Sequence, residues 1–305
     1  MRAIAIHDFD SAPTLTYLPD PTPGPGEVLV RVRASSLNGY DAAVAAGMLK
    51  GMMEHRFPAV LGKDFAGTVE ALGDGVSRSA IGDAVFGVVM KPYVGDGGFG
   101  EYVAVGEPYV SRVPDGLELA TAGALGLAGT AAITAVDAVA PRSGQTVLIS
   151  GATGGVGALA LQYVVASGAT AIATARSGPE TELVRELGAE QIVDYAGDLA
   201  DQVRAVAPNG VSALLHFAGD GGRLADLLDS GGRLASTIGF GPDQHAAAIT
   251  ITANPTSATL DRIAADAVAG RLRVPITRSH SLTDLPEALA EFAAGALGKI
   301  AITLP

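Results

Sequence analysis

In the first third of the chain, valine-rich stretches show partial alternation of apolar and polar residues. They cover residues 27–36, 67–72, 83–89 and 101–107. Alternation with a period of two is typical of strands that bury one face. Proline and glycine separate the stretches, as in PDPTPGPGE at 19–27, and both favour turns. The pattern as far as about Gly116 therefore predicts a compact, mostly antiparallel β-domain.

After Leu119 the apolar pattern changes to strands that alternate with helices. Strands are expected at 145–150, 170–175, 191–195, 211–218 and 232–239, with helices between them at 156–167, 179–187, 199–206 and 222–228. This alternation favours a parallel sheet with both faces covered. Residues 246–253 (AAAITITA) predict one more strand, at an edge.

The tail predicts a helix at 257–269, a strand at 275–281, a helix at 285–294 and a last strand at 299–305. Residues 119–140 are long and low in charge, but they consist largely of alanine, glycine and threonine. They also contain Asp137. A buried helix is therefore expected there rather than a membrane span.

Composition limits the class of protein. A chain of 305 residues has room for two domains, and a net charge of −12 disfavours nucleic acid or an anionic membrane as the main partner. The absence of cysteine excludes disulfides and thiolate metal sites and suits a reducing cytosol. The opening residues, MRAIAIHDFD, lack the apolar region of a signal peptide. A cytoplasmic location is expected.

A glycine-rich loop lies between the strand at 145–150 and the helix that follows it. It reads Ala152-x-Gly154-x-x-Gly157, with Gly151 and Gly155 in addition, so alanine replaces the first glycine of the G-x-G-x-x-G dinucleotide pattern. Gly154 would let the backbone approach a pyrophosphate, and Gly157 would let helix and strand pack closely. N–H groups of the first helical turn would then face the phosphates. The predicted dinucleotide site comprises Ala152, Thr153, Gly154, Gly155, Val156 and Gly157.

The end of the second strand indicates which dinucleotide binds. NAD sites usually place an acidic residue there, on the ribose hydroxyls. Here the strand ends ATARSG, with Arg176 and Ser177 at its tip and no carboxylate before Glu180. Guanidinium pairs well with phosphate, so these residues favour NADP(H), with its additional 2′-phosphate. A solvated surface arginine is the alternative interpretation.

Several ordered segments together resemble the medium-chain dehydrogenase/reductase superfamily. They lie at 23–41, 58–73, 97–105, 127–136, 150–157 and 298–304, so the likeness covers essentially the whole chain. The chain is most similar to the zinc-independent quinone oxidoreductases, the group that includes zeta-crystallin. The resemblance implies an α/β protein with a GroES-like catalytic domain at 1–118. A doubly wound Rossmann NADP-binding domain would follow at 119–256, and a C-terminal return to the catalytic domain at 257–305.

The resemblance also implies site residues. Asn38 matches the asparagine of an N-x-x-D segment that lines the catalytic cleft. Thr130 matches a threonine under the nicotinamide, and Tyr195 a tyrosine near the adenosine. The ends of two parallel strands are expected to hold the cofactor through Phe217, Ala218, Gly219, Ile238, Gly239 and Phe240.

No metal is expected. Zinc-dependent relatives have an early cysteine ligand and a GHE segment, whereas here the segment is Gly62-Lys63-Asp64, with an ammonium in place of the imidazole. The five histidines show no ligand spacing. Without zinc to polarise a carbonyl, hydride transfer needs an acceptor that is already electrophilic, such as a quinone or an activated alkene.

The proton donor is harder to identify. Enoyl-thioester reductases of the superfamily have a tyrosine shortly after the N-x-x-D segment, where this chain has Leu49 and Lys50. Tyr40 is a candidate substitute; otherwise solvent supplies the proton, or the hydroquinone dianion is protonated unaided. This departure argues against an enoyl-thioester substrate.

The sequence therefore predicts an NADPH-dependent oxidoreductase that reduces a quinone or similar conjugated carbonyl. A 2-alkenal or enone double-bond reductase is one alternative, and a non-catalytic NADPH-binding regulator is another. Residues 246–253 are expected to pair edge to edge in a homodimer, because an unpaired edge strand invites pairing and the resemblance implies the same arrangement.

Overall fold

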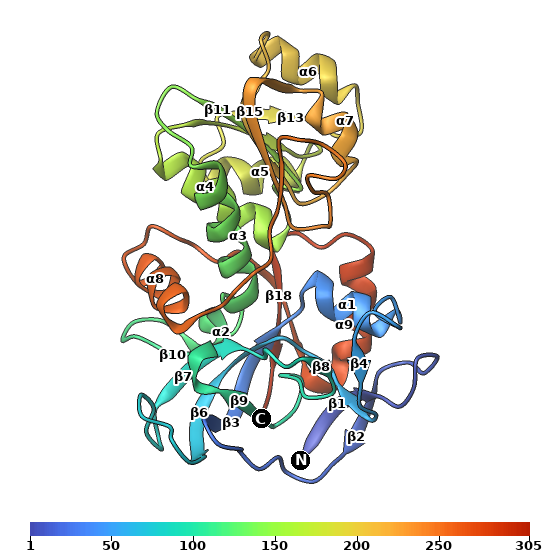
Figure 1. Cartoon of the computed structure of the whole chain (residues 1–305), viewed down its shortest axis with the longest axis vertical. Coiled ribbons are helices and arrows are strands. Elements are labelled where there is room, and N and C mark those ends of the chain that lie inside the picture. Colours follow the sequence, from blue (N-terminus) through green and yellow to red (C-terminus); the bar gives the residue numbers. More distant parts are fainter. The chain divides into compact units, whose positions relative to one another are not determined.

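The chain folds into two compact units (Figure 1), in a computed structural model that describes residues 1–305. The β-rich unit comprises Met1–Leu127, Pro255–Ala269 and Ile276–Pro305. The α/β unit comprises Ala128–Asn254 and Gly270–Pro275. The first division falls inside a helix, α3 (Gly126–Val139), rather than at the position 118/119 expected from the sequence.

A sheet of seven strands forms the centre of the β-rich unit. Its order is β10-β7-β6-β3-β18-β17, and β9 also pairs with β3. The strands are β3 (Glu27–Ser36), β6 (Asp64–Leu72), β7 (Ala84–Val88), β9 (Tyr102–Gly106), β10 (Val110–Arg112), β17 (Ile276–Ser281) and β18 (Lys299–Thr303). Only β17 and β18 pair in parallel. The predicted, mostly antiparallel character of this region is confirmed.

Two smaller sheets complete the unit. One has the order β2-β1-β5, and the other pairs β4 with β8. Their strands are β1 (Arg2–Ile6), β2 (Thr14–Tyr17), β4 (Glu54–His55), β5 (Ala59–Val60) and β8 (Tyr93–Val94). Single-turn helices η1 (Glu107–Tyr109) and η2 (Leu282–Asp284), with α8 (Ser257–Val268) and α9 (Leu285–Ala293), pack on the unit.

The core of this unit follows from alternation along its strands. Val28, Val30 and Val32 of β3 are fully buried, whereas Arg31 between them is exposed. Strand β18, between β3 and β17, is buried on both faces from Lys299 to Ile302. The last part of the chain therefore completes the sheet that the first part begins.

Two helical features differ from the sequence prediction. Helix α1 (Gly39–Ala45) lies in a region expected to hold only strands and turns; the Asn38 amide donates to Asp41 Oδ2 at 2.9 Å, a capping pattern that could have signalled it. The single helix expected at 119–140 is interrupted into α2 (Leu119–Ala122) and α3. At the break, a side chain on Gly123 would lie 2.9 Å from the Ala34 carbonyl carbon, so close backbone approach separates the two helices. No helix is long and apolar enough to cross a membrane.

The α/β unit contains six parallel strands in the order β13-β12-β11-β14-β15-β16. They are β11 (Thr146–Ser150), β12 (Thr170–Thr174), β13 (Gln191–Val193), β14 (Val211–His216), β15 (Leu228–Ser236) and β16 (Ala248–Thr250). The chain runs outward from β11 in one direction and from β14 in the other. Right-handed crossovers then place the connecting helices on opposite faces. This is the predicted doubly wound sheet, and it is confirmed.

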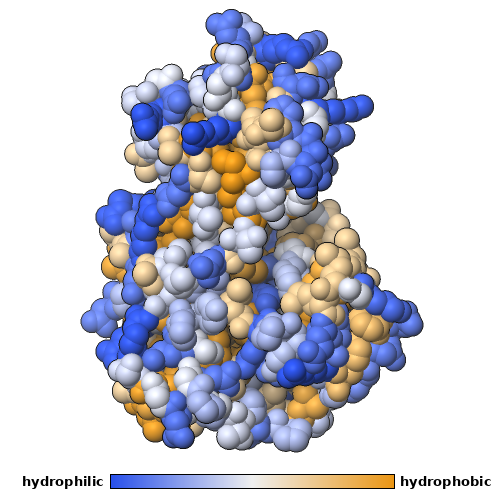
Figure 2. Space-filling model, viewed as in Figure 1, coloured by the Kyte–Doolittle hydropathy of each residue, from blue (hydrophilic) through white to orange (hydrophobic).

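Helices connect the strands close to the predicted positions. They are α4 (Gly155–Ala166), α5 (Pro179–Glu186), α6 (Leu199–Val206) and α7 (Gly221–Ala225). Helix α7 ends earlier than expected, and β15 begins earlier, because Leu228 already pairs with Val211 of β14. Figure 2 shows one face of the molecule, on which hydrophobic patches lie among hydrophilic residues.

Candidate functional site

The glycine loop joins β11 to α4 in a conformation that requires glycine at two positions. Gly151 has a φ of +76°, and a side chain on Gly157 would lie 2.1 Å from the Gly151 carbonyl oxygen. Around Gly154 the space is open, since a side chain there would meet only that oxygen at 3.6 Å. Gly154 is also the N-cap of α4, and no side chain caps the helix. The first-turn N–H groups therefore remain available to an anion.

A pocket of about 700 Å³ opens where the strand order reverses, beside this loop. We call it the strand-end pocket, because the ends of β11, β12, β13 and β14 line it. Four predicted residues line it, Thr153, Tyr195, Ala218 and Gly219, together with Gly151 of the glycine loop. The sequence analysis missed other lining residues: Ser150, Thr174, Gly197, Asp198, Leu199, Ala200, Asp220, Arg223, Leu224 and Leu227. Their positions at or just after strand ends were the available signal.

Hydrogen bonds between neighbouring strands fix the floor of the strand-end pocket. Thr174 Oγ1 accepts from the Gly151 amide at 3.0 Å and donates to the Ile149 carbonyl at 3.2 Å. The Ser150 hydroxyl donates to the Ala218 carbonyl. Ala152 is fully buried, so its side chain serves packing while its backbone belongs to the loop. The loop is thus held rigidly over the sheet.

The predicted residues after β14 and β15 surround a buried histidine. His216 lies 3.0 Å from Ser236 Oγ through Nδ1 and 3.2 Å from the Gly219 carbonyl through Nε2. The ring of Phe240 packs edge-on against it, with centroids 5.8 Å apart. Burial lowers the pKa of His216. Phe217 and Phe240 are partly buried, and Ala218, Ile238 and Gly239 are exposed.

Arg176, at the end of β12, has a carboxylate partner that the sequence analysis did not anticipate. Glu180 folds back so that its Oε1 accepts from Arg176 Nε at 2.8 Å and its Oε2 accepts from the Arg176 amide at 2.8 Å. The Tyr195 hydroxyl donates to the same carboxylate at 3.0 Å. Burial raises the pKa of Glu180, but these hydrogen bonds outweigh it and hold the pKa below its ordinary value.

The expectation that no carboxylate competes for Arg176 is therefore wrong, because Glu180, the nearest acidic residue along the chain, turns back to the strand end. The Arg176 side chain nevertheless remains 59% exposed. Its guanidinium lies 5.6 Å from the ring of Tyr195, which brings two of the predicted cofactor residues together. Ser177 beside them is exposed.

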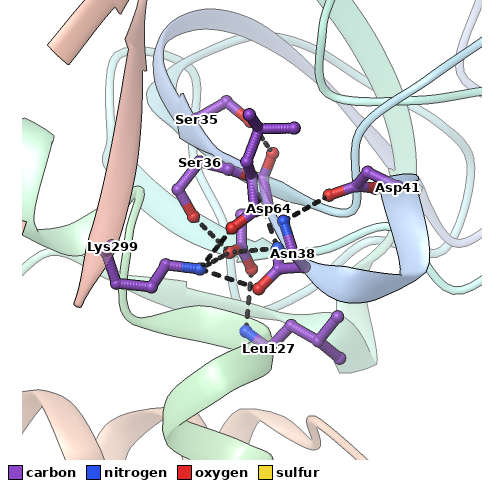
Figure 3. A network of polar contacts seen from close by, with 8 residues as sticks. Ser35, Ser36, Asn38, Asp41, Asp64, Leu127 and Lys299 are labelled. Carbon is purple, nitrogen blue, oxygen red and sulfur yellow. Dashed lines mark hydrogen bonds and ion pairs between the residues drawn. The ribbon is translucent and has the colours of Figure 1, made fainter. Parts of the chain in front are cut away.

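In the β-rich unit, Asn38 belongs to a buried polar network centred on Asp64 (Figure 3). Asp64 Oδ2 accepts from Ser36 Oγ at 2.6 Å and from Asn38 Nδ2 at 2.9 Å. Its Oδ1 accepts from the Leu127 amide at 2.7 Å, at the first turn of α3. Lys299 Nζ donates to Asn38 Oδ1 at 2.7 Å and lies 3.6 Å from Asp64. We call these five residues the Asp64 cluster.

The Asp64 cluster fixes the orientation of the Asn38 amide, because its oxygen faces an ammonium and its nitrogen faces a carboxylate. Asp64 is fully buried, and Lys299 is only 2% exposed. Burial lowers the pKa of Lys299, against the opposing effect of Asp64 and Asp41. Asn38 therefore orders the backbone between β3 and α1, whatever else it contacts.

Beside this cluster lie Tyr40, Asp41 and Lys63. The Tyr40 hydroxyl donates to Met53 Sδ at 3.5 Å, and its ring lies 4.5 Å from Lys63 Nζ. Burial raises the pKa of Tyr40 and lowers that of Lys63. Asp41 is buried, and its Oδ1 has no hydrogen-bond partner. Across the chain, no group of three or more histidine, cysteine, aspartate or glutamate side chains is placed to hold a metal ion.

Comparison with known families accounts for both units. Residues 24–115 match the family described as "Alcohol dehydrogenase GroES-like domain", and residues 155–264 match "Zinc-binding dehydrogenase". The chain belongs to the medium-chain dehydrogenase/reductase superfamily. The resemblance inferred from the sequence is thereby confirmed, together with its fold of a GroES-like unit and a Rossmann unit.

Individual relatives of this superfamily member carry different names. A mycocerosic acid synthase-like polyketide synthase of Mycobacterium tuberculosis is 38% identical over 69% of this chain and 10% of that protein. A chloroplast envelope quinone oxidoreductase homolog of Arabidopsis thaliana is 31% identical over 66% of this chain and 62% of that protein. The matches thus span a tenth of the first relative and under two thirds of the second.

Solved structures of superfamily members match over the whole chain. The quinone oxidoreductase of Coxiella burnetii has a TM-score of 0.89 at 26% identity, covering 100% of this chain and 99% of that one. A mycobacterial protein solved in complex with NADPH has a TM-score of 0.85 at 25% identity, covering 99% of this chain and 100% of that one. These likenesses support the quinone oxidoreductase-like branch of the superfamily.

The residues present fit a nicotinamide dinucleotide. Thr130, on α3, is fully buried with no hydrogen-bond partner for its hydroxyl, which is costly unless a ligand supplies one. The uncapped first turn of α4 offers N–H donors to phosphates. The open space at Gly154 leaves room for the approach. The Thr130 hydroxyl and the first-turn N–H groups of α4 have no side-chain partner within the chain, and each suits a different part of one dinucleotide.

Proposed function

We propose that the chain is an NADPH-dependent oxidoreductase that transfers a hydride to a quinone or similar conjugated carbonyl without a metal. One observation carries the proposal: the strand-end pocket adjoins an uncapped helix N-terminus at the reversal of strand order in the sheet. Doubly wound sheets bind dinucleotides at that point. Superfamily membership and the quinone oxidoreductase relatives support the same activity.

The bound cofactor would supply the hydride, and residues of this chain would hold it. The backbone from Ala152 to Gly157 would bind the pyrophosphate, with Thr130 donating to the nicotinamide amide. The strand-end groups Phe217–Gly219 and Ile238–Phe240 would enclose the rest. Binding and orientation of this kind, with water excluded, is the protein's share of hydride transfer.

The preference for NADPH rests on Arg176, Ser177 and Tyr195. The guanidinium remains more than half exposed while Glu180 orders one of its edges. A 2′-phosphate carries close to two negative charges, so it would compete well with a single carboxylate for the arginine. NADH presents only a hydroxyl there.

The metal-free part of the proposal rests on Lys63. Its ammonium occupies the position of an imidazole ligand in zinc-dependent relatives, and it donates to the Val89 carbonyl at 2.8 Å. An acceptor would therefore have to be electrophilic without Lewis-acid help.

A specific observation favours a second acceptor class. Two 38% identical relatives are named as a mycocerosic acid synthase-like polyketide synthase and a phthioceranic/hydroxyphthioceranic acid synthase, names that denote the synthesis of acids. A conjugated acyl thioester has the same electrophilic carbon as an enone, although the chain lacks the tyrosine expected after its N-x-x-D segment. A simple 2-alkenal or enone remains the closest alternative to a quinone.

The test is NADPH and NADH oxidation by the purified chain with panels of quinones, enones and enoyl thioesters, before and after exhaustive chelation. We expect turnover with NADPH that survives chelation. Cofactor binding without turnover on any panel would instead support a non-catalytic, NADPH-binding regulator. Activity lost on chelation and restored by zinc would contradict the metal-free proposal.

We further propose that the protein is a homodimer. Strand β16 is the edge of the sheet and pairs only with β15, so its other edge is available to a second copy. The small-molecule acceptor and this second copy are the partners proposed. Light scattering at micromolar concentration tests the dimer, and a monomer would contradict it.

A further inference from the structure

A small polar pocket lies in the β-rich unit, and the proposal above uses only one of its lining residues, Lys63, as evidence against a metal. Its polar lining comes from α1, from the segment before β6 and from around β8: Tyr40, Asp41, Lys63, Tyr93 and Asp96. The cavity volume is about 20 Å³. A space of that size holds about one water molecule when polar partners surround it. The pocket is therefore suited to a single bridging water.

Asp41 is the innermost polar group of this pocket. It is 1% exposed; its Oδ2 accepts from the Asn38 amide, and its Oδ1 has no partner. Burial and the neighbouring Asp64 carboxylate raise the pKa of Asp41 to about 7, against the opposing effect of Lys299 and Lys63. Asp41 can thus gain and lose a proton near neutral pH.

Lys63 is the outer member of the pair. It is partly exposed, whereas Asp41 is not, so it is the group that a small molecule can reach. One of its three N–H groups is used by the Val89 carbonyl, and the ammonium lies over the ring of Tyr40. Burial lowers the pKa of Lys63, which eases release of its proton.

We propose that Lys63 and Asp41, bridged by one water molecule, form the proton-delivery site for the reduced acceptor, with Lys63 as the donor. The proposal rests on the proposed function and deepens it. It favours conjugated carbonyl acceptors that must be protonated on carbon, because protonation of a hydroquinone oxygen by solvent is fast without help. Lys63 is then a catalytic residue, and Asp41 acts through it.

The proton balance closes in three steps. Hydride adds to the β-carbon of the acceptor and leaves an enolate; a Lys63 N–H bond then breaks as the carbon–hydrogen bond forms. The neutral amine next takes the Asp41 proton through the bridging water. Solvent finally returns a proton to the carboxylate. The net reaction consumes NADPH, the acceptor and one proton, and yields NADP⁺ and the reduced acceptor.

Three variants test the site: Lys63→Ala, Asp41→Asn and, as a control, Arg112→Ala. Arg112 is also cationic, but its side chain is exposed, pairs with Asp83 and lies outside the pocket. Asparagine keeps an oxygen for the Asn38 amide, so α1 retains its cap. Steady-state NADPH oxidation is followed from pH 6 to pH 9 with one enone and one quinone.

We expect Lys63→Ala to lower kcat with the enone about 100-fold, the usual size of a general-acid effect, and to affect the quinone far less. Methylammonium in solution should restore part of the lost rate. Asp41→Asn should remove the fall in wild-type kcat above neutral pH, and Arg112→Ala should match the wild type. An unchanged enone rate in Lys63→Ala, or no rescue by the amine, would overturn the proposal.

A second measurement needs no turnover. Carboxyl ¹³C NMR of the wild type should show one aspartate that titrates near neutrality, and this signal should be missing from Asp41→Asn. If no such signal exists, the proton-delivery site is wrong even when the enzyme is active. If none of the acceptors tested supports NADPH oxidation by the wild type, the proposed function itself fails.

Discussion

The strand-end pocket and the Asp64 cluster differ in whether their polar groups already have partners within the chain. The pocket adjoins an uncapped helix and a glycine loop, and hydroxyls tie that loop to neighbouring strands. The Asp64 cluster is built from buried charged and polar side chains that satisfy one another, together with the Leu127 amide. The first leaves donors free for a ligand, whereas the second leaves almost none.

This difference determines how each region should respond to mutation. In the strand-end pocket, a substitution can remove ligand binding without touching the fold. In the Asp64 cluster, removal of one charged partner leaves the other as an uncompensated buried charge. Stability and function should therefore separate in the first region and change together in the second.

The largest effect is expected from Asp64→Asn or Lys299→Met. Either change leaves a buried charge without its partner and should lower the free energy of unfolding by about 3–5 kcal/mol. Chemical denaturation measures it. The exposed pair Arg56–Glu54 serves as control, and Glu54→Gln should cost under about 1 kcal/mol. Equal, small losses in both pairs would show that the cluster is not a stabilising centre.

Next in size is the pH dependence that Asp41 gives to stability. Its folded pKa, about 7, lies above the ordinary value, so folding favours the protonated form. This contribution is fully present below about pH 4, is lost as pH rises to 7, and stays lost above that. The free energy of unfolding of Asp41→Asn should therefore rise relative to that of the wild type by up to about 3 kcal/mol between pH 5 and pH 8. This corresponds to ~1.4 kcal/mol per pH unit over about two units.

Thermal denaturation of both proteins across that range measures the gain. The comparison between variants cancels the other titrating groups, which both proteins share. A gap in Tm that stays constant with pH would mean that Asp41 keeps an ordinary pKa despite its burial.

A paired test within the glycine loop comes third. Gly157→Ala would force a side chain to within 2.1 Å of the Gly151 oxygen and should cost about 1–3 kcal/mol of stability. Gly154→Ala meets nothing closer than 3.6 Å and should leave Tm unchanged while weakening NADPH binding. Thermal melts and fluorescence titration separate the two effects. Identical behaviour of the two variants would contradict the pocket as a backbone-built ligand site.

The last prediction concerns cofactor binding at Arg176. Arg176→Ala should weaken NADPH binding about 10- to 100-fold, because a charge-assisted hydrogen bond to the 2′-phosphate is lost. NADH binding should change little. Glu180→Gln should move the other way and tighten NADPH, because it removes the carboxylate that competes for the guanidinium. Dissociation constants for both cofactors decide it, and equal weakening of both would make Arg176 a surface residue.

Local patterns in the sequence were enough to predict most of the fold. The alternating valines of β3 and the glycine loop before α4 are signals carried by neighbouring residues, and both elements lie where expected. The break between α2 and α3 was not predictable in this way, since it depends on close approach to Ala34 of a distant strand.

The sites divide along the same line. The loop from Ala152 to Gly157 has a sequence pattern, whereas the contact between Asp64 and Lys299 joins the first and last thirds of the chain and has none. The ion pair between Arg176 and Glu180 joins residues only four positions apart, but the sequence pattern did not predict it. That spacing predicts contact inside a helix, and Arg176 precedes the helix.

The position of β18 between β3 and β17 has a consequence for synthesis on the ribosome. Nearly all of the α/β unit, from Ala128 to Asn254, leaves the ribosome before β18 does, so it can complete its sheet while the chain is still growing. The β-rich unit cannot, because the partner of Asp64 and the strand beside β3 have yet to emerge. Until then the edge of β3 that β18 will cover has no strand beside it, and the Asp64 carboxylate has no ammonium. The β-rich part that is translated first therefore cannot complete its sheet until the last strand has been made.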